Sequence, residues 1–134
     1  MILPHDLQHF PTSHLIVMAD HIMAHFYLVG GNAVEEVSSV SEPKELQSDK
    51  ELNTEPSKLD EERVRRLVID IGKEVTRLVR NHGIDRVHLV MKKDLANPMI
   101  DHLDAPTAAK VGSVLSIDAS NISMIEIVRR IFEK

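Results

Sequence analysis

The order of the apolar segments predicts an α/β fold built on a mixed sheet. Three strand-like runs come first, at residues 14–19, 23–29 and 33–40, and a long helical segment follows them. Two further strands, at 86–91 and 114–117, then alternate with helices. The short links favour antiparallel pairing of the first three strands, whereas strand–helix–strand units favour parallel pairing with right-handed crossovers.

The first three strands differ in character in a way that predicts their places in the sheet. Leu15 to Ala19 is continuously apolar, as expected of a central strand covered on both faces. Gly30-Gly31-Asn32 predicts a tight turn, because glycine and asparagine tolerate positive φ. The third strand carries Glu35 and Glu36, and such polar side chains suit a sheet edge. We therefore expect a ribonuclease H-like mixed sheet of five strands flanked by helices.

The middle of the chain predicts a linker followed by an amphipathic helix. Residues 41–59 combine prolines with many charges and few apolar side chains, so we expect a flexible acidic linker. Asp60 is the expected N-cap of a helix that runs to about Asn81 and carries an apolar stripe on one face. We expect one domain over 1–134, with the linker joining a three-stranded unit at 14–40 to an α-β-α-β-α unit at 60–134.

Asp94 and a capping box at Ser123 mark the starts of two later helices. Asp94 is the expected N-cap of a short helix that reaches His102, with Pro98 near its first turn or at a break. The sequence Ser123-Met124-Ile125-Glu126 is a capping box that opens the last helix.

Composition limits the compartment and the chemistry. The chain has no cysteine, which excludes disulfides and thiolate metal sites and suits a cytoplasmic protein. It contains no apolar run of the roughly 18 residues that a membrane span needs, and its start lacks the pattern of a signal peptide. Only 3% of the residues are aromatic, so few side chains are suited to stacking on bases. We expect no cofactor.

The net charge of −5 is distributed unevenly. Residues 41–62 hold eight acidic and three basic side chains, whereas residues 63–82 hold six basic and two acidic ones. Four of the six basic side chains on the long helix fall within one quadrant of a 3.6-residue wheel, away from the apolar stripe. They are Arg66, Lys73, Arg77 and Arg80.

This basic face is the main candidate binding surface. Arginines spaced along a helix can follow the phosphates of a nucleic acid, so RNA or a ribosome is one expected partner. The alternative is a solvated face opposite a buried stripe, with its charge neutralised by the acidic linker. A protein partner that pairs with an exposed sheet edge is a further hypothesis.

Three aspartates form the alternative site. Asp20, Asp94 and Asp118 each follow a predicted strand, and carboxyl ends of parallel strands meet at one edge of a sheet. Clustered acids at such an edge could bind divalent metals and catalyse hydrolysis. Equally, Asp94 could cap a helix, and Asp20 and Asp118 could be turn residues.

Histidine spacing is the remaining candidate for a metal site. His5 and His9, and His21 and His25, have i, i+4 spacing, but the glutamate of a zinc-binding His-Glu-x-x-His helix is absent. His21 and His25 also flank a predicted hairpin, so we expect no metal site there. The sequence contains no nucleophile elbow and no phosphate-binding glycine loop.

Several apolar runs and their flanking residues resemble a known bacterial family. They are Leu15-Ile16-Val17-Met18-Ala19-Asp20, His25-Phe26-Tyr27-Leu28-Val29, Glu35-Glu36-Val37, Asp85-Arg86-Val87-His88-Leu89-Val90, Leu95-Ala96-Asn97, Lys110-Val111 and Leu115-Ser116-Ile117-Asp118-Ala119-Ser120. Over 14–132, apart from the linker, the series resembles the host attachment proteins, or proteins required for attachment to host cells. That family is similar to the middle domain of archaeal and eukaryotic peptide-chain release factors and of Pelota.

The resemblance implies a sheet of order 3-2-1-4-5 and a binding module associated with translation. Release factors carry a Gly-Gly-Gln motif for hydrolysis of peptidyl-tRNA, whereas the only Gly-Gly here is followed by Asn32 in a predicted turn. We therefore expect a non-catalytic binding module. The alternatives are the metal-dependent hydrolase and the protein-interaction module.

Overall fold

A five-stranded mixed sheet forms the centre of the structure, a computed structural model that describes residues 2–3, 10–41, 56–117 and 122–132. The strands are β1 (Phe10–Ala19), β2 (Met23–Gly31), β3 (Ala33–Ser41), β4 (Arg86–Val90) and β5 (Val111–Leu115). Their order across the sheet is β3-β2-β1-β4-β5. β1 pairs antiparallel with β2 and parallel with β4. The predicted fold class and strand order are therefore confirmed.

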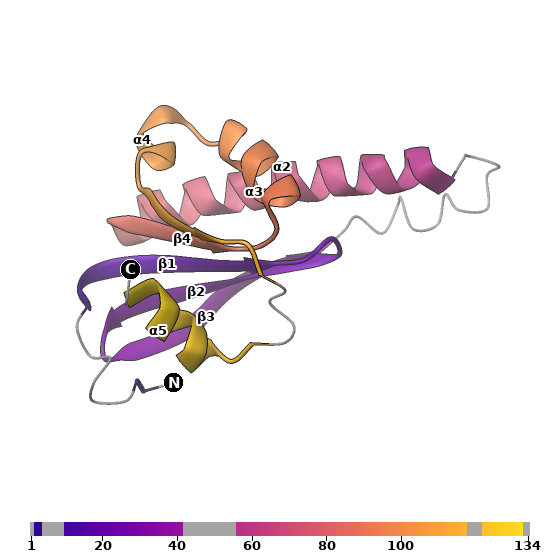
Figure 1. Ribbon diagram of the computed structural model, residues 1–134. Helices are drawn as coiled ribbons and strands as arrows, with labels where there is room; N and C mark the ends of the chain where they lie inside the picture. The colour runs from indigo at the N-terminus through magenta and orange to yellow at the C-terminus, as the bar shows by residue number, and fades with distance from the viewer. Residues whose placement is uncertain (1, 4–9, 42–55, 118–121, 133–134) are drawn as a thin grey trace.

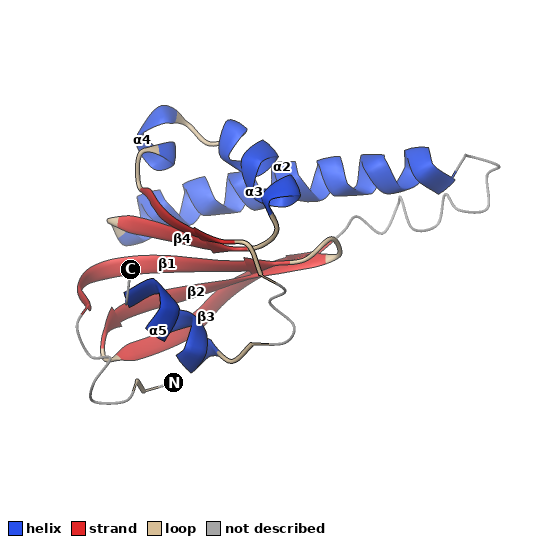
Figure 2. Ribbon diagram, viewed as in Figure 1, coloured by secondary structure: helices blue, strands red, loops and turns tan. Residues whose placement is uncertain are grey.

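Helices cover both faces of the sheet (Figures 1 and 2). Three of them, α2 (Pro56–His82), α3 (Lys93–Asp101) and α4 (Ala105–Ala108), lie on one face. The last, α5 (Met124–Phe132), lies on the opposite face. The first turns of α2 extend past the ends of the strands (Figure 1). Among the residues that the structure describes, no helix is long and apolar enough to cross a membrane.

The larger core lies between α2 and the sheet. Leu67, Ile71 and Val75 from the apolar stripe of α2 are fully buried, as is Phe26 of β2. Gly72 permits α3 to approach closely, because a Cβ at this position would lie 3.2 Å from Cβ of His102. Because the apolar stripe predicted from the sequence faces the sheet, the opposite face of α2 points outward.

A smaller core lies under α5. Ile127 and Val128 of α5 pack with Ile16 and Val29 from the sheet, and Leu3 completes the cluster. The N–H of Glu126 donates to Oγ of Ser123 at 3.2 Å, which is one of the two hydrogen bonds expected of the predicted capping box.

Several boundary predictions were wrong, and β1 begins at Phe10, four residues earlier than expected. α2 begins at Pro56, because proline suits the first position of a helix, so Asp60 lies inside the helix rather than at its cap. The last residues of the predicted flexible linker therefore belong to α2, and residues 42–55 lie outside the described segments.

The N-cap of α3 is Lys92, and Asp94 lies in the first turn, while Pro98 lies inside that helix. β5 begins at Val111, three residues earlier than expected.

Candidate functional site

The outer face of α2 carries the basic side chains predicted from the sequence. Arg66, Arg77 and Arg80 have side chains that are 56%, 53% and 70% exposed, and Lys73 is also exposed. From Arg66 to Arg80 the helix rises about 21 Å, at about 1.5 Å per residue. The structure therefore presents the four residues as one row on a rigid element.

Acidic neighbours pair with most of this row. Nε of Arg66 lies 3.5 Å from Oε1 of Glu62 on the preceding turn, and Arg65 donates two hydrogen bonds to the same carboxylate. The hydrogen bond from Arg65 lowers the pKa of Glu62. Nη2 of Arg80 lies 2.5 Å from Oδ2 of Asp104, the N-cap of α4. Among the described residues, Lys73 has no ion-pair partner.

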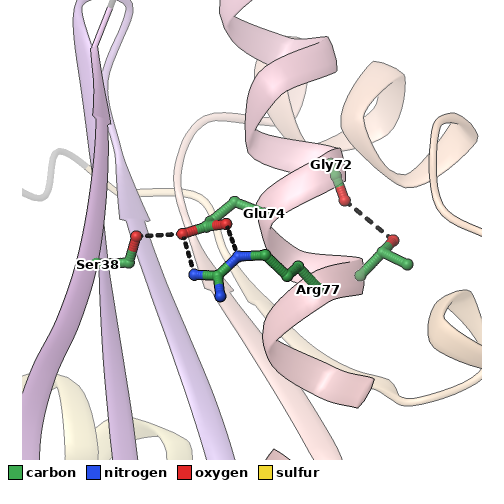
Figure 3. Close-up of polar contacts among 5 residues, drawn as sticks. Ser38, Gly72, Glu74 and Arg77 are labelled. Atoms are coloured by element: carbon green, nitrogen blue, oxygen red, sulfur yellow. Dashed lines mark hydrogen bonds and ion pairs between the residues drawn. The ribbon is translucent and has the colours of Figure 1, made fainter. Parts of the chain in front are cut away.

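Arg77 and Glu74 form a latch between α2 and the edge strand β3 (Figure 3). Nε and Nη2 of Arg77 donate to the two carboxylate oxygens of Glu74 at 2.6 Å and 2.7 Å. Oγ of Ser38, beside a bulge in β3, donates to Oε2 of the same carboxylate. The hydrogen bonds from Arg77 lower the pKa of Glu74, whose side chain is only 16% exposed. In the part of the chain that the structure describes, Arg77 is therefore the one residue of the row whose carboxylate partner also bonds to a strand of the sheet.

The exposed ion pairs leave the row able to bind other anions. Pairs between exposed side chains contribute about 0–1 kcal/mol each to stability, because water and salt screen them. Glu62 and Asp104 therefore neutralise Arg66 and Arg80 without holding them firmly. An incoming phosphate can replace a carboxylate, since the guanidinium fork fits both groups.

The carboxyl ends of β1 and β4 bring two of the three predicted aspartates to the same edge. Asp20 accepts hydrogen bonds from the N–H groups of Ile22 and Met23 at 2.7 Å and 2.9 Å, and so closes the β1–β2 turn. Asp94 accepts from Nε2 of His21 at 2.9 Å, and this hydrogen bond lowers its pKa. Asp118 lies outside the described residues.

These contacts are those of turn and surface residues. Within the described segments, no three side chains of histidine, aspartate or glutamate are grouped so that they could hold a metal ion. The metal-dependent hydrolase, which needs Asp118 as a third ligand, stays a prediction.

The histidines take part in contacts that the sequence did not predict. His21 and His25, which share i, i+4 spacing, bind different carboxylates, because Nδ1 of His25 lies 2.5 Å from Oε1 of Glu36. On the α5 face of the sheet, the rings of His14 and His88 stack with centroids 5.1 Å apart. These pairs join residues on different elements, so no local spacing could have revealed them.

No family model and no curated protein matches the chain. Solved structures that resemble the chain include three that do so at low identity. The crystal structure of the archaeal translation termination factor aRF1 has a TM-score of 0.49 at 10% identity, and a structure described as an archaeal protein has 0.50 at 9%. The PilM-PilN type IV pilus biogenesis complex has 0.49 at 14%.

The matched region is most of this chain and less than half of each neighbour. It covers 90%, 90% and 94% of this chain, and 38%, 37% and 44% of the respective neighbours. At such identities a structural likeness concerns the fold alone, because one fold hosts many unrelated functions.

Proposed function

We propose that this chain is a non-catalytic binding domain that contacts the phosphates of structured RNA, as in a ribosome, through the outer face of α2. The observation that carries the proposal is the row of exposed basic side chains along a helix that projects past the sheet. The strand order 3-2-1-4-5, implied by the resemblance to the release-factor middle domain, is also the order of the structure.

Contact with the RNA backbone fits the composition better than recognition of bases does. The chain has three phenylalanines, one tyrosine and no tryptophan, so it offers few surfaces on which unpaired bases could stack. Phosphate contacts need arginine and lysine on a rigid element, which α2 supplies. Arg66, Lys73 and Arg80 are the expected contacts. Arg77 contributes only when its ion pair with Glu74 opens.

A fluorescence titration of a labelled ribosomal RNA hairpin tests this proposal. The variant Arg66→Ala/Lys73→Ala/Arg80→Ala removes three positive charges from α2. The control variant Lys92→Ala/Lys93→Ala/Arg130→Ala removes three positive charges from exposed positions on other helices or their caps. We expect the α2 variant to bind about tenfold more weakly or worse at low salt, because each phosphate contact adds to affinity.

The control variant should bind within about twofold of the wild-type protein, because it leaves all four basic residues of the α2 row in place. Equal losses in the two variants would mean that overall charge, and not α2, attracts RNA. Absence of binding by the wild-type protein would overturn the RNA proposal.

A further inference from the structure

The end of α3 lies directly against α2, beside the middle of the row of basic residues. Gly72 of α2 precedes Lys73, and a Cβ at Gly72 would lie 3.2 Å from Cβ of His102 and 3.6 Å from the carbonyl oxygen of Met99. His102 is the C-cap of α3, and it is exposed. Because successive residues of a helix differ by about 100° around its axis, His102 stands at the border of the outer face that carries Lys73.

The backbone around His102 is fixed by the end of α3 and by the core. The N–H of His102 donates to the carbonyl of Met99 at 3.0 Å, and the N–H of Leu103 donates to the carbonyl of Ile100 at 3.0 Å. Leu103, the next residue, packs against the larger core. His102 therefore has a defined place beside α2.

The segment from His102 to Asp104 follows the second half of the row. Asp104 pairs with Arg80, so the segment runs beside the row from the neighbourhood of Lys73 to Arg80. The N–H of Thr107 donates to Oδ1 of Asp104 at 3.0 Å, and the hydrogen bonds from Thr107 lower the pKa of Asp104. Asp104 thus stays ionised near neutral pH and offsets the charge of Arg80. The charge of the row is least offset at Lys73, where His102 stands.

We infer that His102 is a further phosphate contact of the same RNA, beside Lys73, and that binding tightens when this histidine is protonated. The inference rests on the proposed binding of RNA by α2. A protonated imidazole carries a positive charge and donates from both ring nitrogens, so it can join a lysine in binding a phosphate group. Affinity should therefore rise as the pH falls.

Four charged side chains lie around His102 on the elements that meet there. They are Lys73 and Arg80 of α2, Asp101 of α3 and Asp104 at the start of α4. The two basic groups attract phosphates and the two acidic groups repel them. Side chains of these types keep their charge between pH 7.5 and pH 5.5, whereas histidine gains one. At this site, a change of affinity over that range therefore reports on His102.

Titration of the labelled ribosomal RNA hairpin with the full chain, at pH 7.5 and pH 5.5, tests the inference. The wild-type protein should bind more tightly at pH 5.5. In His102→Gln this increase should be about fivefold smaller than in the wild-type protein, which is the effect of one charge pair in water. At pH 5.5 the slope of log affinity against log salt should also be smaller by about one in His102→Gln, because one phosphate contact is lost.

Two further variants separate His102 from the other histidines. His82→Gln also replaces an exposed histidine, at the end of α2 and off the row, and should keep the wild-type increase. His102→Lys carries its charge at both pH values and should bind more tightly than the wild-type protein at pH 7.5. Circular dichroism at each pH checks that all the proteins are folded.

The possible outcomes distinguish this inference from the proposed function. A wild-type protein that binds no RNA at either pH would overturn both. Binding that needs the basic residues of α2 but rises equally with acid in the wild-type protein and in His102→Gln would overturn the role of His102 alone. Equal losses in His102→Gln and His82→Gln would overturn it too, since the effect would then come from overall charge.

Discussion

His14 of β1 and His88 of β4 form a stacked pair in which Nδ1 of His14 lies 2.9 Å from Nε2 of His88. One ring must donate and the other accept, so the pair needs at least one neutral histidine. His88 is 6% exposed, and burial lowers the pKa of His14 below its usual 6.5, with Asp85 opposing and Arg86 reinforcing this shift. The contact therefore depends on pH.

The unfolding free energy should fall as the pH is lowered below about 6.5. In the unfolded chain His14 regains its ordinary pKa, so below 6.5 the unfolded state binds more protons than the folded state does. Urea denaturation between pH 7.5 and 5.5 measures this dependence. His14→Gln should flatten the dependence, whereas His82→Gln, at the exposed end of α2, should keep the wild-type slope. Identical slopes in all three proteins would contradict the role of the pair.

The latch between α2 and β3 should contribute measurably to stability. Glu74→Gln should lower the unfolding free energy by about 1–2 kcal/mol, since hydrogen bonds to charged groups contribute more than neutral ones. Glu62→Gln is the matched control, because Glu62 also pairs with arginines on α2 but makes no hydrogen bond or ion pair with the sheet among the described residues, and it should lower the unfolding free energy clearly less than Glu74→Gln does. Equal losses of unfolding free energy in the two variants would show that the hydrogen bond from Ser38 to Glu74 adds nothing to stability.

The same latch should weaken in acid. Arg77 lowers the pKa of Glu74 below its usual 4.5, so the latch stabilises the fold above that value. This contribution disappears as the pH falls through the lowered pKa, because the protonated carboxyl loses its ion pair. In Glu74→Gln this part of the acid dependence should be missing.

The three aspartates should support no catalysis. Asp20→Asn/Asp94→Asn/Asp118→Asn should fold, because asparagine keeps the carbonyl oxygen that can close the β1–β2 turn and accept from His21. Nuclease and phosphatase assays with Mg²⁺ or Mn²⁺ should find the same background in this variant and in the wild-type protein. Metal-dependent cleavage that vanishes in the triple variant would instead establish the hydrolase.

The sequence predicted the sheet better than it predicted the ends of its elements. Strand order follows from link lengths and crossover rules, which depend on the whole chain and tolerate boundary errors. The start of β5 was missed because Val111-Gly112-Ser113 follows an alanine-rich helical turn and lacks strongly strand-forming residues at its centre. The start of α2 was missed because Asp60 is a good cap, while Pro56 is an equally good first residue.

The candidate site was predicted as a set of positions but not as a set of contacts. Helical spacing placed the basic residues on one face, and the pairing of Arg77 with Glu74 follows from i, i+3 spacing. The contacts of Arg80 with Asp104 and of His21 with Asp94 join residues far apart in the chain. They depend on how α4 and α3 pack, which no local pattern specifies.

The most direct test of phosphate binding by α2 is the dependence of RNA affinity on salt. Affinity for the ribosomal RNA hairpin should fall steeply as salt rises from about 50 mM to about 200 mM, because each phosphate contact releases bound counterions. In Arg66→Ala/Lys73→Ala/Arg80→Ala, the slope of log affinity against log salt should shrink by about two to three, since three contacts are lost. The control Lys92→Ala/Lys93→Ala/Arg130→Ala should keep the wild-type slope. A slope that is the same in all three proteins would contradict phosphate binding by the outer face of α2.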